Sequence, residues 1–503
     1  MKSYLLLLTA MVLAPACLFA ADPALTVYNQ NFAVVRDSVS LDLKAGVNTV
    51  AFSGTTAHVE PESVILRDPT GQIALQILEQ NYRNDPISQS LLLFLNEGKT
   101  IEFEIIRGDQ REVVSGKVIR SGYTAHSQQA MRRYGQRYAQ SQMALASPSG
   151  GGGEPIIEIN GKLHFGLPGR PIFPALGDDT ILKPTLTWQL QAVRPVKLDA
   201  ELAYVTGGMS WEADYNVITP EQGDALEFIG WVTIDNQSGK TFPNARINLM
   251  AGDVSKLQDP AVFASSFARS DLSAPAKEPA VTEKAFDEYH LYTLQRPTTL
   301  RDRETKQVEF VRAGGVKAQR IYIYDGAKID WPRFRNYNPE SLRTQPDYGT
   351  RSNPKVWVMQ EFKNNAANGL GIPLPKGRLR FYRRNGPALE FTGENAIDHT
   401  PKDELVRVYT GNAFDLAGER RRTNFKVDNN RRFADESFEI KVRNHKKEPV
   451  EIRVVEHLYR WTTWEITNKS HDFVKTDAQT MEFRLPLKPD EEKVVTYTVH
   501  YTW

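Results

Sequence analysis

Apolar and polar residues alternate with a period of two along much of this chain. Between Lys493 and Trp503, the apolar and aromatic positions fall on one face and the polar positions on the other. Such alternation predicts a half-buried antiparallel β-strand. Three further runs of this kind are predicted as strands: Phe438–Asn444, Val450–His457 and Thr480–Leu485. Short strands separated by turns favour β-sandwiches over alternating β–α units.

The predicted fold is therefore mainly β, a set of antiparallel β-sandwiches with an immunoglobulin-like sandwich at the C-terminal end. A chain of 503 residues is expected to form several domains. The expected boundaries give an N-terminal β-sandwich with an inserted small β-unit, a central β-domain and a C-terminal β-sandwich, at residues 22–195, 196–350 and 351–503.

Three stretches interrupt the strand pattern. One, Ala261–Lys284, is expected to form a long surface loop, and two others carry more specific signals. Good helix formers at Ser127–Ala146 predict one short helical excursion, and a Gly-rich linker follows it, so that helix and linker together lie near 127–154. The third stretch, Trp331–Pro354, carries four prolines among many polar residues and predicts irregular structure.

Residues 1–21 resemble a secretory signal peptide. Lys2 gives a basic start, Tyr4–Leu13 is an apolar run of about ten residues, and small residues near Ala20 offer a cleavage site. The run is too short to span a bilayer, and no later segment is long enough, so we expect no integral membrane span. The expected location is periplasmic or secreted. Acylation at Cys17 is the less favoured alternative, because Ala-Pro-Ala precedes it.

Charge and motifs exclude several classes of function. The 62 basic residues nearly balance the 61 acidic ones, so the chain offers no general attraction for nucleic acid. The motifs of zinc proteases, serine hydrolases and nucleotide-binding proteins are absent. The nine histidines do not pair at the spacings that place two ligands on one face of a strand or helix. We therefore predict no catalytic residues, metal site or cofactor.

The segment GGMSWEADYNV contains three candidate binding residues, Trp211, Asp214 and Tyr215. Aromatic side chains on a sheet face can stack on sugar rings, although they more often fill cores. An acid within a strand, such as Asp214, can be a buried anchor that needs a cation or hydroxyl partner. Binding and structural roles both remain open for these residues.

The segment ENAIDHTPKDE supplies the other candidates, Asp398, His399 and Asp403. Two carboxylic acids and an imidazole could form a binding site or a proton relay. Turn-forming residues are frequent here, and Leu389–Thr392 and Leu405–Thr410 on either side are predicted strands. A turn that connects two strands is therefore the favoured interpretation, with a ligand site at His399 as the alternative.

Several segments in order resemble one bacterial family: SWEADYNV, FIGWVTIDNQSGKTFPNARINLMAGDV, HLYTLQRPTTLRDRETKQV, NGLGIPLPKGRLRFYR and ENAIDHTPKDELVRVYTGNAFDL. This is domain-of-unknown-function family 4139, which is related to proteins labelled mucoidy-inhibitor-like. The resemblance implies an exported, mostly-β envelope protein without an assigned enzymatic activity. It brings no catalytic residues with it.

Two functions compete at this point. The first is a noncatalytic envelope module that binds an envelope protein or a surface glycan. The alternative is a hydrolase of envelope polysaccharide, with carboxylates such as Asp214, Asp398 and Asp403 as acid and base. Acid–base catalysis needs such carboxylates to share one cleft, so their placement is informative.

Overall fold

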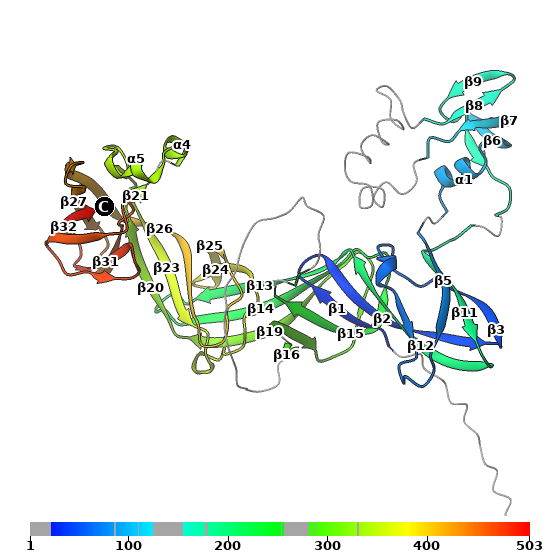
Figure 1. Cartoon of the computed structure of the whole chain (residues 1–503), viewed down its shortest axis with the longest axis horizontal. Coiled ribbons are helices and arrows are strands. Elements are labelled where there is room, and N and C mark those ends of the chain that lie inside the picture. Colours follow the sequence, from blue (N-terminus) through cyan, green and yellow to red (C-terminus); the bar gives the residue numbers. More distant parts are fainter. Residues whose placement is uncertain are drawn as a thin grey trace, which may run out of the picture. The chain divides into compact units, whose positions relative to one another are not determined.

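The computed structural model describes the chain over the following ranges: 22–84, 87–108, 110–123, 154–176, 180–252, 254–255, 281–286, 288–328 and 331–503. The expected leader at 1–21, with Cys17, lies outside these residues, as do nearly all of the expected helix and linker at 127–154 and most of the expected loop at 261–284. The mainly β fold is confirmed (Figure 1). No helix within the described ranges is both long enough and apolar enough to span a bilayer.

The chain forms two compact units. Unit 1 comprises Met1–Ser210, Asp235–Phe267 and Arg296–Thr305, and unit 2 comprises Trp211–Ile234, Ala268–Gln295 and Lys306–Trp503. The domain boundaries expected near residues 195 and 350 stay predictions.

Unit 1 contains a sheet in which strands follow the order β15-β1-β2-β12-β4. Their bounds are Phe242–Ala251, Ala24–Tyr28, Phe32–Leu43, Val196–Gly207 and Ile65–Arg67. β2 and β12 pair antiparallel over twelve residues, from Phe32 opposite Gly207 to Leu43 opposite Val196. β18 (Thr298–Leu300) pairs with β15. Alternate residues of β2 and β12 are buried, as the period-two pattern predicts.

A second sheet of unit 1 places β11 (Thr185–Ala192) between β3 (Gly46–Phe52) and β5 (Gln76–Arg83). Because β5 and β11 are neighbours, the chain between them forms an insertion. That insertion holds α1 (Gln89–Leu95) and a sheet in the order β10-β6-β7-β8-β9. These strands are Arg170–Ile172, Thr100–Arg107, Gln110–Arg120, Ile156–Ile159 and Lys162–Phe165.

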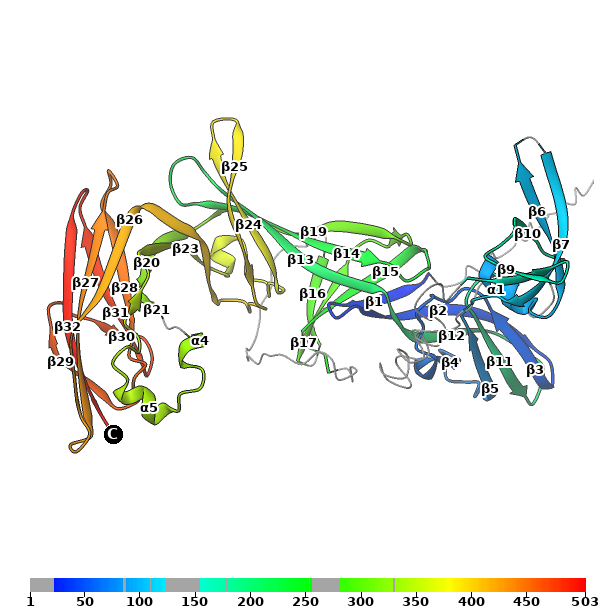
Figure 2. The ribbon, with the colours of Figure 1, turned by 90° about the horizontal axis from the view of Figure 1, so that it is seen from above.

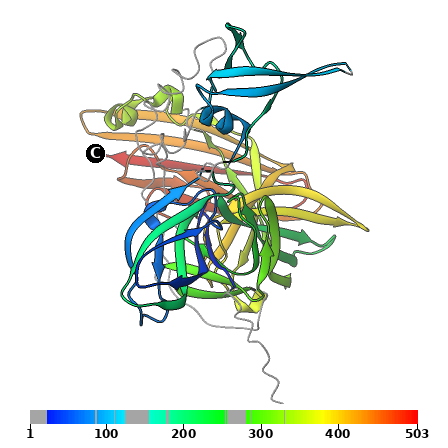
Figure 3. The same ribbon diagram turned by 90° about the vertical axis from the view of Figure 1, so that its right-hand side faces the viewer.

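Helix α1 was not predicted, and its local chemistry explains it. Ser88 caps the helix by accepting a hydrogen bond from the backbone N–H of Leu91. Leu93 then packs against the apolar face of the small sheet, on Ile101, Phe103, Val118 and Ile157. Figure 3 shows α1 against the cyan strands of this sheet. A helix of seven residues with one buried residue is too short to show a helical hydrophobic periodicity in the sequence.

Unit 2 contains a sheet in the order β19-β14-β13-β24-β25. The strands are Glu304–Val316, Leu226–Asn236, Met209–Thr219, Gly377–Asn385 and Ala388–Ile397, and the terminal residues of the first three belong to unit 1. β13 and β24 pair in parallel, with Ala213 opposite Gly377. β16 (Val281–Phe286) and β17 (Tyr289–Leu294) pair antiparallel as a hairpin, so the expected loop at Ala261–Lys284 ends in a strand.

The C-terminal part of unit 2 is one nine-stranded sheet, β29-β32-β27-β26-β23-β20-β28-β31-β30. In that order the strands are Trp464–Lys469, Glu492–Thr502, Phe433–Asn444, Leu405–Asp428, Lys355–Lys363, Ala318–Asp325, Val450–His457, Thr480–Leu487 and Val474–Lys475. A two-stranded ribbon of β21 (Ala327–Lys328) and β22 (Arg351–Ser352) accompanies it. The strands predicted near residues 438, 450, 480 and 493 are all present (Figure 2).

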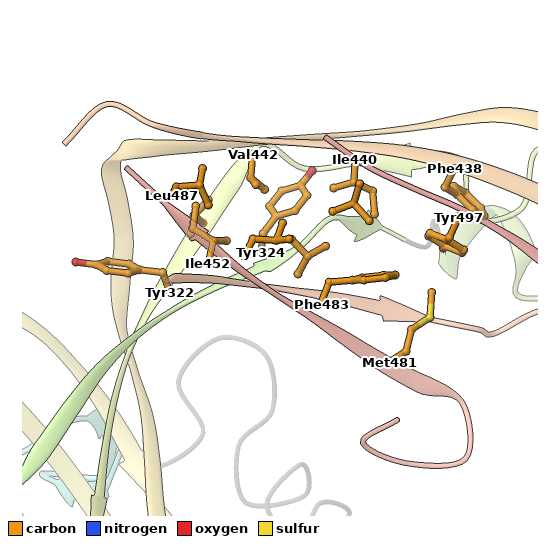
Figure 4. Packing of buried hydrophobic residues seen from close by; sticks show 14 of the residues in the cluster. Tyr322, Tyr324, Phe438, Ile440, Val442, Ile452, Met481, Phe483, Leu487 and Tyr497 are labelled. Carbon is orange, nitrogen blue, oxygen red and sulfur yellow. The ribbon is translucent and has the colours of Figure 1, made fainter. Parts of the chain in front are cut away.

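The nine-stranded sheet folds over on itself and encloses one core, which makes this region sandwich-like. Figure 4 shows Phe438, Ile440 and Val442 of β27 facing Ile452 of β28 and Phe483 of β31. The two layers belong to one continuous sheet, whereas an immunoglobulin-like domain has two separate sheets.

The long strand β26 carries the sheet from one layer to the other. Its first half pairs with β23 and its second half with β27, and register shifts interrupt both pairings. Gly411 lies in the middle of β26 with φ of 151°, a value that side chains rarely permit. At Gly418 the ring of Tyr324 occupies the space that a Cβ atom would need.

The expected irregular stretch at Trp331–Pro354 contains two short helices, so that prediction was wrong in part. They are α4 (Trp331–Phe334) and α5 (Pro339–Thr344). Asn338 caps α5 by accepting from the N–H of Ser341, and Pro339 occupies the first helical position. The prolines that suggested a loop therefore include one that begins a helix.

Buried charges attach this helical segment to the sheet. Arg460 donates to the carbonyl oxygens of Leu342, Arg343 and Gln345 at 2.8–3.1 Å, and to the Oε1 atom of Glu436 at 2.8 Å. Arg460 and Glu436 are both fully buried.

A second buried pair, Arg420 and Glu456, lies close by. Nε of Arg420 donates to both carboxylate oxygens of Glu456, at 2.8 and 2.9 Å, and Nη1 donates to the carbonyl oxygen of Gly349. Burial alone would lower the pKa of Arg420. The charge of Glu456, together with smaller contributions from Tyr497, Tyr459 and the hydrogen bond to Glu456, outweighs burial and raises that pKa well above its ordinary value.

Candidate binding site

The three residues predicted on β13 are buried. Trp211 is 4% exposed and packs near Tyr292, with ring centroids 6.1 Å apart. The hydroxyl of Tyr215 donates to the carbonyl oxygen of Pro375 at 2.6 Å, and burial raises its pKa well above the ordinary value. These two aromatic side chains belong to a core, so neither offers a face for stacking on a sugar.

Asp214 is also buried, and its partners are clear. Arg380 lies 3.0 Å from Oδ1, and the hydroxyl of Thr233 donates to Oδ2 at 3.1 Å. A cation and a hydroxyl thus engage the two carboxylate oxygens. This arrangement is that of a structural anchor between β13, β14 and β24.

The segment with Asp398, His399 and Asp403 is the turn between β25 and β26. The backbone of Thr400 pairs with Leu374 in both directions, at 2.8 and 2.9 Å. His399 accepts at Nδ1 from the backbone N–H of Lys376 at 3.1 Å. Asp403 adopts a positive φ of 65°, which suits a turn.

Asn364 holds this turn closed. Its buried side-chain amide donates to the carbonyl oxygens of Ile372 and Pro401, both at 2.8 Å. The side chain of Asp398, in contrast, is 90% exposed and lies 3.7 Å from Nζ of Lys376.

The turn and the Asp214 strand are brought to opposite sides of β24. Lys376 contacts the turn, and the next residue, Gly377, pairs with Ala213 of β13. The backbone therefore places the two predicted groups close together. Their contacts nevertheless differ. The turn contacts residues within 364–376, whereas the side chain of Asp214 contacts β14 and β24.

A different place in unit 2 has the features of a binding site. It is a cavity of about 280 Å³ that the sequence did not reveal. Its lining comes from β13, β20, β23, β24, β25 and β26, and from Lys446 beyond β27: Thr219, Arg320, Tyr322, Val358, Gln360, Phe381, Arg383, Thr392, Thr410, Gly411, Asn412, Ala413, Phe414, Asp415 and Lys446. We call it the Gln360 cavity.

Gln360 is the most informative residue of this cavity. Its side chain is 5% exposed, and its Oε1 atom is buried without a hydrogen-bond partner. A buried acceptor left unpaired costs about 1–3 kcal/mol. A donor group supplied by a ligand in the cavity would satisfy it.

Three cations line the same cavity. Arg320 lies 3.6 Å from Asp224, and Lys446 lies 3.1 Å from Glu448. Arg383 donates to a neutral acceptor, the carbonyl oxygen of Glu221, at 2.9 Å. Within the described ranges Arg383 forms no ion pair with a carboxylate.

Burial alone would lower the pKa of Lys446, but hydrogen bonds with Glu448 and Tyr322 raise it above the ordinary value. Its ammonium group also lies 5.6 Å from the ring centroid of Tyr322. Lys446 is therefore a persistent positive charge of the Gln360 cavity.

A second cavity of about 550 Å³ adjoins the first, because Arg320, Tyr322 and Arg383 line both. Its remaining lining residues come from the β13–β14 turn, from β20 and from the start of β28: Glu221, Gln222, Gly223, Asp224, Gln319, Ile321, Glu448, Pro449, Val450, Glu451 and Arg453. In the described part of the chain, no three His, Cys, Asp or Glu side chains are placed to hold a metal ion.

One pattern in the sequence could have pointed to Gln360. Val356, Val358 and Phe362 occupy one phase of β23, and Gln360 stands in the same phase. A polar residue at an apolar phase either finds a buried partner or faces a cavity. The cations could not be found this way, because arginines and lysines are frequent on every exposed strand face.

A family model described as a domain of unknown function, DUF4139, matches residues 200–503. A search of curated proteins found no match.

Proposed function

Since the chain belongs to the DUF4139 family, whose description assigns no activity, we propose its function from the site itself. The proposed function is that of an exported, noncatalytic module of the cell envelope that binds a surface glycan in the Gln360 cavity. Export rests on the leader expected at residues 1–21. The resemblance to mucoidy-inhibitor-like proteins is consistent with a role at a polysaccharide surface.

The unpaired Oε1 atom of Gln360 carries this proposal. It can accept a hydrogen bond from a ligand, and sugars offer hydroxyl donors on every ring. Hydroxyl oxygens of the lining can accept from further sugar hydroxyls: those of Thr219, Thr392 and Thr410, which donate their own protons to backbone carbonyl oxygens, and that of Tyr322. Phe414, which is fully exposed, adds an aromatic surface for the apolar face of a sugar.

The hydrolase alternative gains no support from the placement of its carboxylates. A glycosidase needs two carboxyl groups flanking the bond to be cleaved. Asp214 is engaged by Arg380, and Asp398 faces solvent beside Lys376. None of the three acids proposed for the hydrolase lines the Gln360 cavity.

The proposal is tested by measuring retention of the mature chain on a panel of immobilised neutral and acidic polysaccharides. Phe414→Ala removes an exposed ring of the cavity lining and is expected to weaken retention without affecting folding. Phe165→Ala is the matched control, because Phe165 is 73% exposed and belongs to unit 1.

Equal retention of both variants would place binding elsewhere. A chain that binds no polysaccharide, or binds only protein from envelope extracts, would overturn the proposal. Release of shorter saccharides from the panel would support the hydrolase instead.

A further inference from the structure

The ionisable residues of the Gln360 cavity are unbalanced. Arg320, Arg383 and Lys446 supply three positive charges, and Asp415 supplies the one carboxylate of the lining. Arg320 and Lys446 have carboxylate neighbours outside this lining, Asp224 and Glu448. The excess positive charge is thus greatest at Arg383.

Arg383 is suited to bind an anion. Its Nη2 atom donates to the carbonyl oxygen of Glu221, a neutral acceptor that leaves the charge of the guanidinium uncompensated. A guanidinium has five N–H donors in a planar fork, and the fork matches the two oxygens of a carboxylate. A ligand carboxylate could therefore bind Arg383 while the contact with Glu221 is kept.

Gln360 restricts what kind of anion fits. Its unpaired Oε1 atom is an acceptor, so a ligand that also presents a donor fits the cavity better than one that only accepts. An ionised carboxylate or a sulfate ion accepts hydrogen bonds and donates none. One molecule with an anionic group beside hydroxyl groups satisfies both Arg383 and Gln360.

We propose that the Gln360 cavity binds a carboxylate-bearing sugar unit, with its carboxylate at Arg383 and Lys446 and a hydroxyl donating to Gln360. This inference rests on the proposed glycan binding and deepens it. It assigns the ligand to acidic saccharides, such as the uronic acids of an envelope polysaccharide.

The second cavity indicates a chain of sugars. Ligand pockets commonly measure about 300–1,000 Å³, and the Gln360 cavity, at about 280 Å³, lies just below that range. The second cavity continues past Arg320, Tyr322 and Arg383. It is lined by four carboxylates and three arginines, so it does not favour a second anion: Glu221, Asp224, Glu448, Glu451, Arg320, Arg383 and Arg453. It suits the hydroxyl-rich part of a neighbouring unit.

The test compares acidic oligosaccharides with their uncharged methyl esters. Isothermal titration of the full mature chain, in calcium-free buffer at low salt, uses oligogalacturonates and oligoglucuronates and the methyl esters of the same oligosaccharides. The acids are expected to bind at least about tenfold more tightly than their esters, because a charge-assisted hydrogen bond is lost with the carboxylate. Added salt is expected to reduce this difference.

Arg383→Gln keeps a polar side chain and removes the charge. It is expected to abolish the preference for the acids and to leave binding of the esters unchanged. Arg384→Gln is the matched control on the same strand, because Arg384 pairs with Glu227 and does not line either cavity. If Arg383→Gln does not fold, as judged by circular dichroism, Lys446→Gln serves the same test.

The outcomes separate the two proposals. Equal affinity for acids and esters would overturn the inference and leave glycan binding standing. An acid preference that Arg383→Gln and Lys446→Gln both retain would overturn the assignment of the carboxylate to this cavity. Failure to bind any oligosaccharide, charged or neutral, would overturn the proposed function as well. Free monosaccharide acids in the same titration show whether one unit suffices or a chain is required.

Discussion

The buried pair of Arg420 and Glu456 offers a direct test of how the C-terminal part of unit 2 is stabilised. Replacing Glu456 by Gln removes a charge whose side chain is fully buried. Arg420 would then face a neutral amide, and one N–H group of that amide would point toward a guanidinium donor. The hydroxyl of Tyr497, which donates to Glu456, would lose a charged acceptor.

The expected loss follows from the burial of Arg420, which is 1% exposed at its side chain. Removing one partner of a buried pair costs about 3–5 kcal/mol, because the remaining charge stays out of water without compensation. Coulomb's law at an effective dielectric constant of about 20 gives about 4 kcal/mol for charges about 4 Å apart. The two values agree, and either is a large part of a typical total stability of about 5–15 kcal/mol.

Urea unfolding measured by tryptophan fluorescence is the appropriate assay. Trp461, Trp464 and Trp503 pack against the core of the folded-over sheet and report on its loss. With a slope of about 2–3 kcal/mol per molar urea, Glu456→Gln is expected to lower the midpoint by about 1–2 M.

Glu439→Gln is the matched control. Glu439 lies on neighbouring β27, and its partner Arg421 directly follows Arg420, but the Arg421 side chain is 64% exposed. An exposed pair is worth less than about 1 kcal/mol. If both variants shift the midpoint by the same small amount, the buried pair does not stabilise the sheet and the reasoning is refuted.

Three further predictions concern the same unit. The hydrogen bond that His457 donates to Asp325 raises the pKa of His457, so the contribution of this pair to stability is fully present below pH about 6.5 and is lost as pH rises through the folded-state pKa. The stability difference between wild type and His457→Gln should therefore shrink from pH 5.5 to pH 8.5 in urea titrations, and a growing difference would contradict this. Gly349→Ala should lower the unfolding free energy by about 2 kcal/mol or more in the same assay. The φ angle of Gly349 is +70°, and a Cβ atom there would overlap the hydroxyl of Tyr459. An unchanged midpoint would show that the loop adapts freely. Deleting Lys493–Trp503 should yield insoluble protein on expression, because it removes nearly all of β32 from between β27 and β29; a soluble, folded truncation would refute that role.

The C-terminal strand illustrates what local pattern can predict. Val495, Tyr497, Val499 and Tyr501 are at most 2% exposed, as their alternation with polar residues implied. The turn at Asp398–Asp403 was also correctly interpreted from its turn-forming residues. Both features depend on residues adjacent in the chain, so their information is present in a single short segment.

The candidate site shows where local pattern stops. Trp211 and Tyr215 were offered as binding residues and are core residues. The alternation within β13 indicates which side chains share a face, but not whether that face packs on a core or meets a ligand. Gln360 was not singled out at all. Its neighbours Arg320 and Val408 in the sheet are separated from it by 40 or more positions in the chain.

The sequence alone determined the mainly β architecture, the positions of the C-terminal strands and the resemblance to the family, since each depends on periodicity or on motifs within short stretches. The tertiary structure alone decided which face each strand buries, that one sheet forms both layers of the sandwich, and that Gln360, Arg383 and Lys446 share a cavity. The physical reason is that strand pairing joins residues far apart in the chain, and the burial that gives a side chain its role exists only after those pairings form.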